Sequence, residues 1–210
     1  MKTNEGGAAF GAIGKERSKL LAVIAVAAVM LACVVVLMPV DAEDSVADIE
    51  YTSILPSDFL ALDTDGDGVI TLEDDYRISS YVTVSQDLKV ITNGFSLITN
   101  GDMFVIGTDG VNFEIDATGG GTMSTEIPNA RVVFGGGHEA NVTVTGGTYV
   151  SDWAFVLWGN NQVEGEPVLS FSNVTVNATS IGMWLSYGAI DSVNIVDSEI
   201  NANLAVYLAT

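Results

Sequence analysis

The hydrophobic and polar positions of this chain follow three patterns in succession. Residues 20–40 form one apolar run without a charged residue, and residues 41–56 are acidic and show no period. From residue 87 onward, short runs rich in Val, Ile, Phe and Trp alternate with Gly, Asn, Thr and Ser. Short runs without a helical period predict β-strands. The pattern therefore predicts an apolar N-terminal helix and a C-terminal domain built of strands.

The C-terminal strands repeat. Three segments that begin at residues 144, 171 and 195 align in their apolar positions, so their starts lie 27 and 24 residues apart. Two short strands and turns at such a period are typical of a solenoid whose coils stack on one another. The aligned positions are Val144, Phe171 and Ile195, then Tyr149, Val176 and Ile200, and then residues 153–157, 181–185 and 204–208.

These repeats resemble the right-handed parallel β-helix of pectin-lyase-like proteins. The resemblance covers residues 87–210 and rests on period and pattern, without an invariant motif. It implies an all-β fold, a right-handed parallel β-helix solenoid, whose earlier coils are less regular. A β-sandwich also uses short strands and Gly-rich turns and is the alternative. The strands expected in the earlier coils are residues 88–92, 95–98, 103–106, 111–115 and 131–134.

The chain stops at Thr210, directly after the last predicted strand. No polar helix or loop remains to cover that end, and a bare strand edge invites pairing with another chain. We therefore expect either a truncated solenoid or an end that joins a partner.

The apolar run over residues 20–40 predicts a membrane anchor. Its 21 residues match the roughly 20 that span a bilayer core and exceed the about 7–15 of a signal-peptide core. Three basic residues directly precede the run, and the next one is Arg77. The positive-inside rule therefore predicts a cytoplasmic tail over residues 1–18, a single-pass anchor or uncleaved signal over residues 19–40, and an extracellular bulk. Cleavage after Ala42 is the alternative.

Residues 63–74, which read DTDGDGVITLED, spell a calcium-binding loop. Alternating aspartates on a tight turn can converge on one Ca²⁺, which takes about six to eight oxygens. The spacing resembles one repeat of a dockerin or an EF-hand-like loop, with Asp74 in place of the usual closing Glu. A dockerin has two such loops, whereas this chain has one, and a solvated acidic turn is the alternative. The resemblance implies that calcium is the cofactor and that its ligands are Asp63, Asp65, Asp67, the carbonyl of Val69, Thr71 and Asp74.

This calcium unit is predicted over residues 57–86, after an acidic stalk over residues 41–56. Ser57 is expected to cap a short entering helix, and residues 74–82 are expected to form an exiting helix. One such unit buries little apolar surface, so we expect it to dock on the solenoid and to stiffen the junction when calcium binds.

Strand alternation sorts the repeat into an inner and an outer face. The apolar columns through Phe155 and Leu157 are expected to face the interior. Trp158, Trp184 and Tyr207 are then expected on the outer surface, where aromatic rings can stack on sugar rings. The alternative is that the turn over residues 159–167, or another domain, covers them.

The charge of the chain limits the classes of partner that it is expected to bind. The chain has 7 basic and 27 acidic residues, and from residue 41 onward 3 basic and 25 acidic residues give a formal charge of −22. Such a surface repels nucleic acid and anionic lipid head groups, so no nucleic-acid partner is expected. The only cysteine, Cys33, lies in the apolar run, which leaves the exported part without disulfides. Three sequons predict glycosylation where the host has the machinery, at Asn141, Asn173 and Asn177.

Candidate catalytic groups are sparse. The β-helix lyases that this fold resembles use a basic residue and carboxylate-held calcium, whereas the solenoid offers only Lys89 and Arg131, outside the regular repeats. Asp197 and Glu199 share a predicted strand face, which is typical of a solvated surface as well as of an acid–base pair. His138 has no second histidine with which to build a zinc site.

The sequence therefore predicts a non-catalytic, membrane-anchored, extracellular calcium-binding β-helix protein of the cell surface, for adhesion or carbohydrate binding. Its expected partners are the membrane, through residues 20–40, and carbohydrate or another surface protein. A fragment of a carbohydrate-active β-helix enzyme, either a polysaccharide lyase or a glycoside hydrolase, is the alternative. A dockerin-like assembly module is a third possibility.

Overall fold

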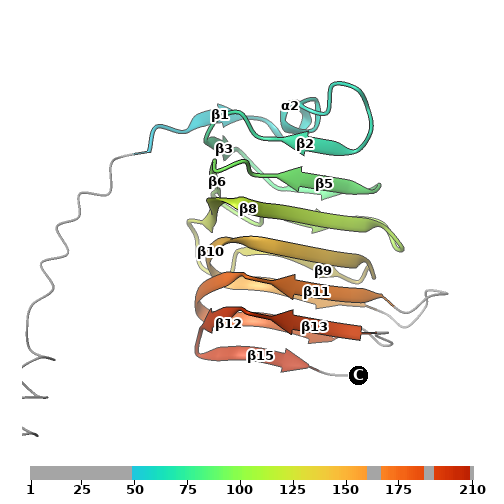
Figure 1. Ribbon diagram of the computed structural model, residues 1–210, viewed down its shortest axis with the longest axis vertical. Helices are drawn as coiled ribbons and strands as arrows, with labels where there is room; N and C mark the ends of the chain where they lie inside the picture. Colours follow the sequence, from blue (N-terminus) through green and yellow to red (C-terminus); the bar gives the residue numbers. More distant parts are fainter. Residues whose placement is uncertain (1–48, 160–166, 187–191, 209–210) are drawn as a thin grey trace, which may run out of the picture. The chain divides into compact units, whose positions relative to one another are not determined.

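The computed structural model describes residues 49–159, 167–186 and 192–208 and shows a parallel β-solenoid of about six turns (Figure 1). The chain divides into two units, Met1–Asp48 and Ile49–Thr210, and the solenoid belongs to the second. The predicted tail and anchor lie outside the described residues. Within the described ranges, no helix is long and apolar enough to cross a membrane.

Fifteen strands and one short helix make up the described part of the chain. In chain order they are β1 (Thr52–Ile54), α2 (Pro56–Leu60), β2 (Val69–Thr71), β3 (Tyr76–Ile78), β4 (Val82–Val84), β5 (Leu88–Ile91), β6 (Leu97–Thr99), β7 (Phe104–Ile106), β8 (Asn112–Thr125), β9 (Arg131–Gly136), β10 (Asn141–Trp158), β11 (Val168–Ser172), β12 (Thr175–Ser186), β13 (Ser192–Val196), β14 (Glu199–Asn201) and β15 (Leu204–Leu208).

The strands stack in three columns that run along the solenoid axis. The first column contains β2, β5, β8, β10, β11 and β13, and the second contains β1, β3, β6, β8, β10, β12 and β14. The third contains β4, β7, β9, β10, β12 and β15. The long strands β8, β10 and β12 turn corners and so belong to more than one column. Every pair in these columns is parallel, which rules out the β-sandwich alternative, because its sheets are antiparallel.

The observed register confirms the predicted repeat. Val144 pairs with Phe171, which in turn pairs with Ile195. The second and third columns show the other two predicted alignments, Tyr149 with Val176 and Ile200, and Leu157 with Leu185 and Leu208.

The core is a stack of inward-facing apolar side chains. Phe155 lies at the centre of one aromatic cluster, with its ring centroid 5.1 Å from those of both Tyr149 and Phe171. All three side chains are fully buried, as are Met183 and Leu185 in the predicted inner columns. Burial of aligned side chains in successive coils is what holds a solenoid together, because each coil covers its neighbour.

The solenoid begins earlier than the sequence predicts. β1 falls in the predicted stalk, and β2, β3 and β4 fall in the predicted calcium unit, yet each pairs with a strand of the following coil. The predicted exiting helix over residues 74–82 is wrong, because this segment contains β3 and leads into β4, and it buries Ile78 and Val82 in the core. The entering helix α2 starts at Pro56 with Leu55 as its N-cap, so Ser57 does not cap it.

Candidate functional site

The outer side of the third column carries two adjacent rows of large side chains that run along the solenoid axis. One row places Trp184 between Val156 and Tyr207, and the other places Trp153 between Arg131 and Ile181. A third row holds Trp158 between the small residues Gly136 and Ser186. We call this surface the aromatic face, and its members are Arg131, Phe134, Trp153, Val156, Trp158, Ile181, Trp184, Leu204 and Tyr207.

A groove of about 480 Å³ lies on the aromatic face. Trp158 and Tyr207 are each 42% exposed, and Trp184 is half-buried between its neighbours. The ring centroid of Trp184 lies 6.1 Å from that of Trp153 and 5.2 Å from that of Tyr207. The described residues that line the groove are Arg131, Phe134, Trp153, Val156, Trp158, Gly159, Trp184 and Ser186.

The three aromatic residues singled out in the sequence therefore lie on one outer surface, although Tyr207 flanks the groove and does not line it. Their role in binding a ligand stays a prediction. Most of the turn that was expected to cover them, residues 160–166, lies outside the described residues.

Sequence reasoning missed Arg131, Phe134 and Trp153 as members of this surface. Arg131 was expected outside the regular repeats, whereas β9 pairs with β10 and aligns Arg131 with Trp153. The sequence shows the alignment of β9 with β10 only weakly. Gly135 and Gly136 stand where β10 has Leu157 and Trp158, so the apolar columns are interrupted at β9.

Arg131 holds Phe134 in place on the aromatic face. Its Nε and Nη2 atoms donate to the two carboxylate oxygens of Asp102 at 2.8 and 2.6 Å. The guanidinium carbon lies 3.6 Å from the centroid of the Phe134 ring. A Cβ on Gly136 would come within 2.1 Å of that ring, so the ring lies directly over the glycine. The ring is thus fixed by a cation above it and by backbone beside it.

One buried N–H group of the aromatic face has no protein partner within the described residues. Trp184 Nε1 is buried and makes no hydrogen bond. The ion pair with Asp102 uses Nε and Nη2 of Arg131, so the Nη1 edge of the guanidinium lies outside that contact. A buried donor without an acceptor costs about 1–3 kcal/mol, and this cost falls on Trp184 Nε1, which is closed to solvent and therefore also to a ligand on the surface.

The predicted calcium loop connects α2 to β2. Asp63, Asp65 and Asp67 each offer a carboxylate oxygen within 4.8 Å of the others. Asp63 accepts backbone hydrogen bonds from Gly66 at 2.9 Å and from Gly68 at 3.0 Å. With a third bond from the Asp67 N–H at 3.2 Å, they fix the turn and occupy three of the roughly four acceptor sites of the Asp63 carboxylate, which leaves about one for a cation.

The other three predicted ligands are arranged differently. Asp74 is not part of the aspartate group, because its Oδ2 atom accepts a hydrogen bond from the Thr52 hydroxyl at 2.6 Å. The Gly68 carbonyl and the Leu72 N–H bond to the backbone around β5. Because the bonding direction alternates along a strand, the N–H and C=O groups of Val69 and Thr71 face away from β5. The aspartate group thus offers carboxylate oxygens that suit a hard cation, whereas Asp74 joins β1 to the residues just before β3.

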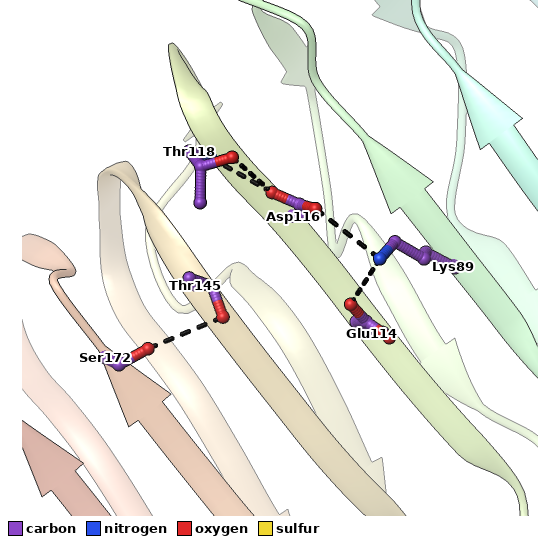
Figure 2. A network of polar contacts seen from close by, with 6 residues as sticks. All are labelled: Lys89, Glu114, Asp116, Thr118, Thr145 and Ser172. Atoms are coloured by element: carbon purple, nitrogen blue, oxygen red, sulfur yellow. Dashed lines mark hydrogen bonds and ion pairs between the residues drawn. The ribbon is translucent and has the colours of Figure 1, made fainter.

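The outer side of the first column carries a network of ion pairs and hydroxyl contacts (Figure 2). Lys89 Nζ lies 2.6 Å from Glu114 Oε1 and 3.4 Å from Asp116 Oδ2. The hydrogen bond to Glu114 raises the pKa of Lys89, and the hydroxyl of Thr118 holds the pKa of Asp116 below its usual range. Lys89 is therefore charged and paired, which makes it a poor proton acceptor.

The remaining candidate groups are separated in the structure. Asp197 lies in the turn between β13 and β14 with φ +48°, whereas Glu199 opens β14, so the predicted shared strand face is wrong. A turn interrupts the alternation on which that prediction depended. His138 Nδ1 lies 3.3 Å from Asp109 Oδ1 on the surface.

The three sequons differ in their surroundings. Asn141 donates to Asn112 Oδ1 at 2.9 Å and accepts the Val168 N–H at 2.8 Å, so its amide is part of a ladder between coils. Asn173 and Asn177 are exposed. The Asn177 amide is also part of a ladder between coils, because its Oδ1 accepts from Asn201 Nδ2 at 3.1 Å, and glycosylation at all three sequons stays a prediction.

No protein-family model, no curated protein and no solved structure matches this chain. The resemblance to pectin-lyase-like proteins is thus supported only as far as a parallel β-solenoid with a repeat. The function has to be argued from the aromatic face and the aspartate loop themselves.

Proposed function

We propose that this chain is a non-catalytic, membrane-anchored surface protein whose solenoid binds carbohydrate through the aromatic face and holds calcium in the loop between α2 and β2. The observation that carries the proposal is the aromatic face. It gathers Trp153, Trp158 and Trp184, which are all the tryptophans of the chain, on one outer surface.

Cross-strand packing accounts for part of this surface, but large aromatic side chains that stay exposed to water, such as Trp158 and Tyr207, gain little from it. The other outer rows of the solenoid are largely polar, as at Lys89, Thr145 and Ser172 in the first column (Figure 2). An apolar outer surface with a groove is typical of a binding site. Sugar rings have apolar faces and polar rims, so they match aromatic rings that lie beside the polar groups of Arg131 and Ser186.

The extracellular location rests on the apolar run over residues 20–40 and on the basic residues before it. The calcium role rests on the convergence of Asp63, Asp65 and Asp67. Because the loop joins α2 to the first coil, a bound Ca²⁺ would stiffen the N-terminal end of the solenoid.

An immobilised glycan array probed with the full chain tests the carbohydrate role. We expect binding that Trp184→Ala abolishes and that Tyr81→Ala leaves unchanged, since Tyr81 is an exposed aromatic residue outside the aromatic face. A Tyr81→Ala variant that loses binding as fully as Trp184→Ala would contradict the assignment.

Calorimetric titration of the full chain tests the calcium role. We expect one Ca²⁺ with a Kd of about 10⁻⁴ to 10⁻³ M, the range of extracellular modules. Asp65→Asn should remove this binding, because it deletes a carboxylate of the group. Asp58→Asn removes an equal charge from α2, outside the group, and should leave the binding intact. Equal losses in the two variants would show a diffuse charge effect and no site.

A further inference from the structure

We infer that the ligand of the aromatic face is an uncharged, linear oligosaccharide that lies along the solenoid axis. The inference rests on the proposed carbohydrate-binding function and adds the class of the sugar and its direction on the protein.

The shape of the apolar surface indicates the direction in which the oligosaccharide lies on the protein. The row that contains Trp184 runs from Phe134 on β9 through Val156 on β10 to Tyr207 on β15 without a polar member. Neighbouring strands lie about 4.8 Å apart, so four side chains in this row extend roughly 14 Å along the axis.

The neighbouring rows show where the apolar surface is wide. The row of Trp153 is also made of large side chains over the same four strands and ends at Leu204, which is 40% exposed. The row of Trp158 has Gly136 and Ser186 on either side. The apolar surface is therefore elongated along the axis, and a chain of linked sugar rings covers it better than a single ring does.

The ion pair between Arg131 and Asp102 indicates that the ligand is uncharged. Arg131 is the only charged residue among the described residues that line the groove, and its side chain is neutralised by the bidentate contact with Asp102. An anionic sugar would bring an unbalanced charge to this groove, on a chain whose formal net charge is −20. An uncharged sugar meets no such repulsion.

The polar contacts suit hydroxyl groups. Ser186 adds a hydroxyl to the lining of the groove, and the Nη1 edge of Arg131 lies outside the ion pair with Asp102. A hydrocarbon surface or a lipid tail could not hydrogen-bond to these two groups. A sugar hydroxyl or ring oxygen can hydrogen-bond to these two groups while the ring stacks on the neighbouring aromatic side chains.

Intrinsic tryptophan fluorescence of the full chain tests this inference directly, because every tryptophan of the chain belongs to the aromatic face. The probes are neutral β-1,4-linked glucose and mannose oligomers of one to six rings, and oligogalacturonates of the same lengths as the anionic counterparts. We expect the neutral series to shift the emission and to bind about tenfold more tightly at four rings than at one, which corresponds to about 1.4 kcal/mol. Trp184→Ala should abolish the response, and Tyr81→Ala should preserve it.

The other outcomes overturn different parts of the inference. Tighter binding of the oligogalacturonates would overturn the uncharged class while leaving the proposed function standing. Equal affinity for one ring and four rings would overturn the axial direction. Glycan-array binding without any change in tryptophan emission would place the sugar elsewhere on the protein. A lack of binding to any sugar, together with self-association that buries the tryptophans, would replace the ligand by a second copy of this chain and overturn the proposed function as well.

Discussion

Acidic side chains at the corners of the coils join neighbouring coils. Asp87 accepts the Asn112 backbone N–H at 2.8 Å, and Asp102 accepts that of Arg131 at 2.9 Å. Asp152 likewise accepts the Asn129 N–H at 2.7 Å. Each bond satisfies a backbone donor at a turn, where the ladder of the sheet is interrupted. Part of the chain's acidity thus serves the fold, so an aspartate on this surface does not by itself indicate a metal site.

These contacts predict how stability depends on pH. Hydrogen bonds from Asn112 hold the pKa of Asp87 below its usual range, and those from Ser180 and Thr179 do the same for Asp152. A lowered pKa in the folded state gives stability that is present above the unfolded-state pKa of about 3.9 and is lost as the pH falls through the folded-state value. The melting temperature should therefore change little from about pH 7 to 5 and decrease below about pH 4.

The variant Asp152→Asn tests this pH dependence. Its amide has one acceptor oxygen, so it replaces only part of the hydrogen-bond acceptor capacity of the carboxylate. It should lower the melting temperature at neutral pH and flatten the decrease in acid. Asp58→Asn changes the net charge equally but lies on the surface of α2, and it should reproduce the parent curve. An identical acid slope in Asp152→Asn and the parent would contradict the structural role of Asp152.

The backbone of Gly121 lies very close to the backbone of the neighbouring coil at Phe95. Its φ is +103°, and a Cβ would lie 2.1 Å from Phe95 O. Gly121→Ala should therefore cost about 1–2 kcal/mol for the conformation and about 1–3 kcal/mol for the overlap. Gly120→Ala isolates the first cost, because its φ is +96° and no atom lies within 4 Å. Urea denaturation should rank Gly121→Ala below Gly120→Ala in stability, and Gly101→Ala, which has neither problem, near the parent.

At the scale of elements, α2 covers the N-terminal end of the solenoid (Figure 1). Phe59 is its one buried residue, and its ring centroid lies 6.1 Å from that of Phe104 on β7. Phe59→Ala should lower the free energy of unfolding by about 3–5 kcal/mol, because it removes a fully buried ring and leaves a cavity above the first coils. Leu60→Ala, at an exposed position of the same helix, is the control.

Hydrogen exchange checks where that loss occurs. Amides of β2, β3 and β4 should exchange faster in Phe59→Ala, whereas those of β10 should change least, because coils contact only their neighbours. A uniform increase along the whole chain would show that the solenoid unfolds as one unit and that α2 is not a local cap.

The elements also show what the sequence could and could not predict. The coils from residue 144 onward were predictable because their apolar columns recur with nearly the same spacing, and the register confirms them strand by strand. β2, β3 and β4 have three residues each, which is too short to show a period. The resemblance to an EF-hand-like loop implies flanking helices, so the sequence predicts an exiting helix over residues 74–82, where the structure has β3 and the start of β4.

The candidate sites were predictable to different degrees. The aspartate group depends on positions close in sequence, so spacing alone was enough to find it. The aromatic face depends on contacts between coils. Trp184 and Tyr207 follow from the regular repeat, whereas Arg131 and Phe134 join through β9, whose glycines hide its alignment with β10. The ion pair between Arg131 and Asp102 links residues 29 apart and could be found only from the fold.

At the scale of the whole molecule, stability should vary along the axis. The inner positions of β10 and β12 are fully buried, as at Phe155 and Met183, whereas Val206 at the same position in β15 is only partly buried. Leu208 is 55% exposed, although it aligns with the buried Leu185. Because a solenoid is stabilised coil by coil, a coil whose inner side chains are only partly buried should open more readily than one whose inner side chains are fully buried.

Native-state hydrogen exchange of the full chain should therefore show the highest protection in β10 and the lowest in β13, β14 and β15. The aromatic face connects this gradient to binding, because Tyr207 on β15 and Phe134 on β9 belong to one row. An oligosaccharide that lies along this row would bind only when β15 is closed, so saturating ligand should slow exchange in β15 more than in β10. A ligand that crosses the row would touch one coil and would leave β15 unchanged, which makes the exchange pattern an independent measure of its direction.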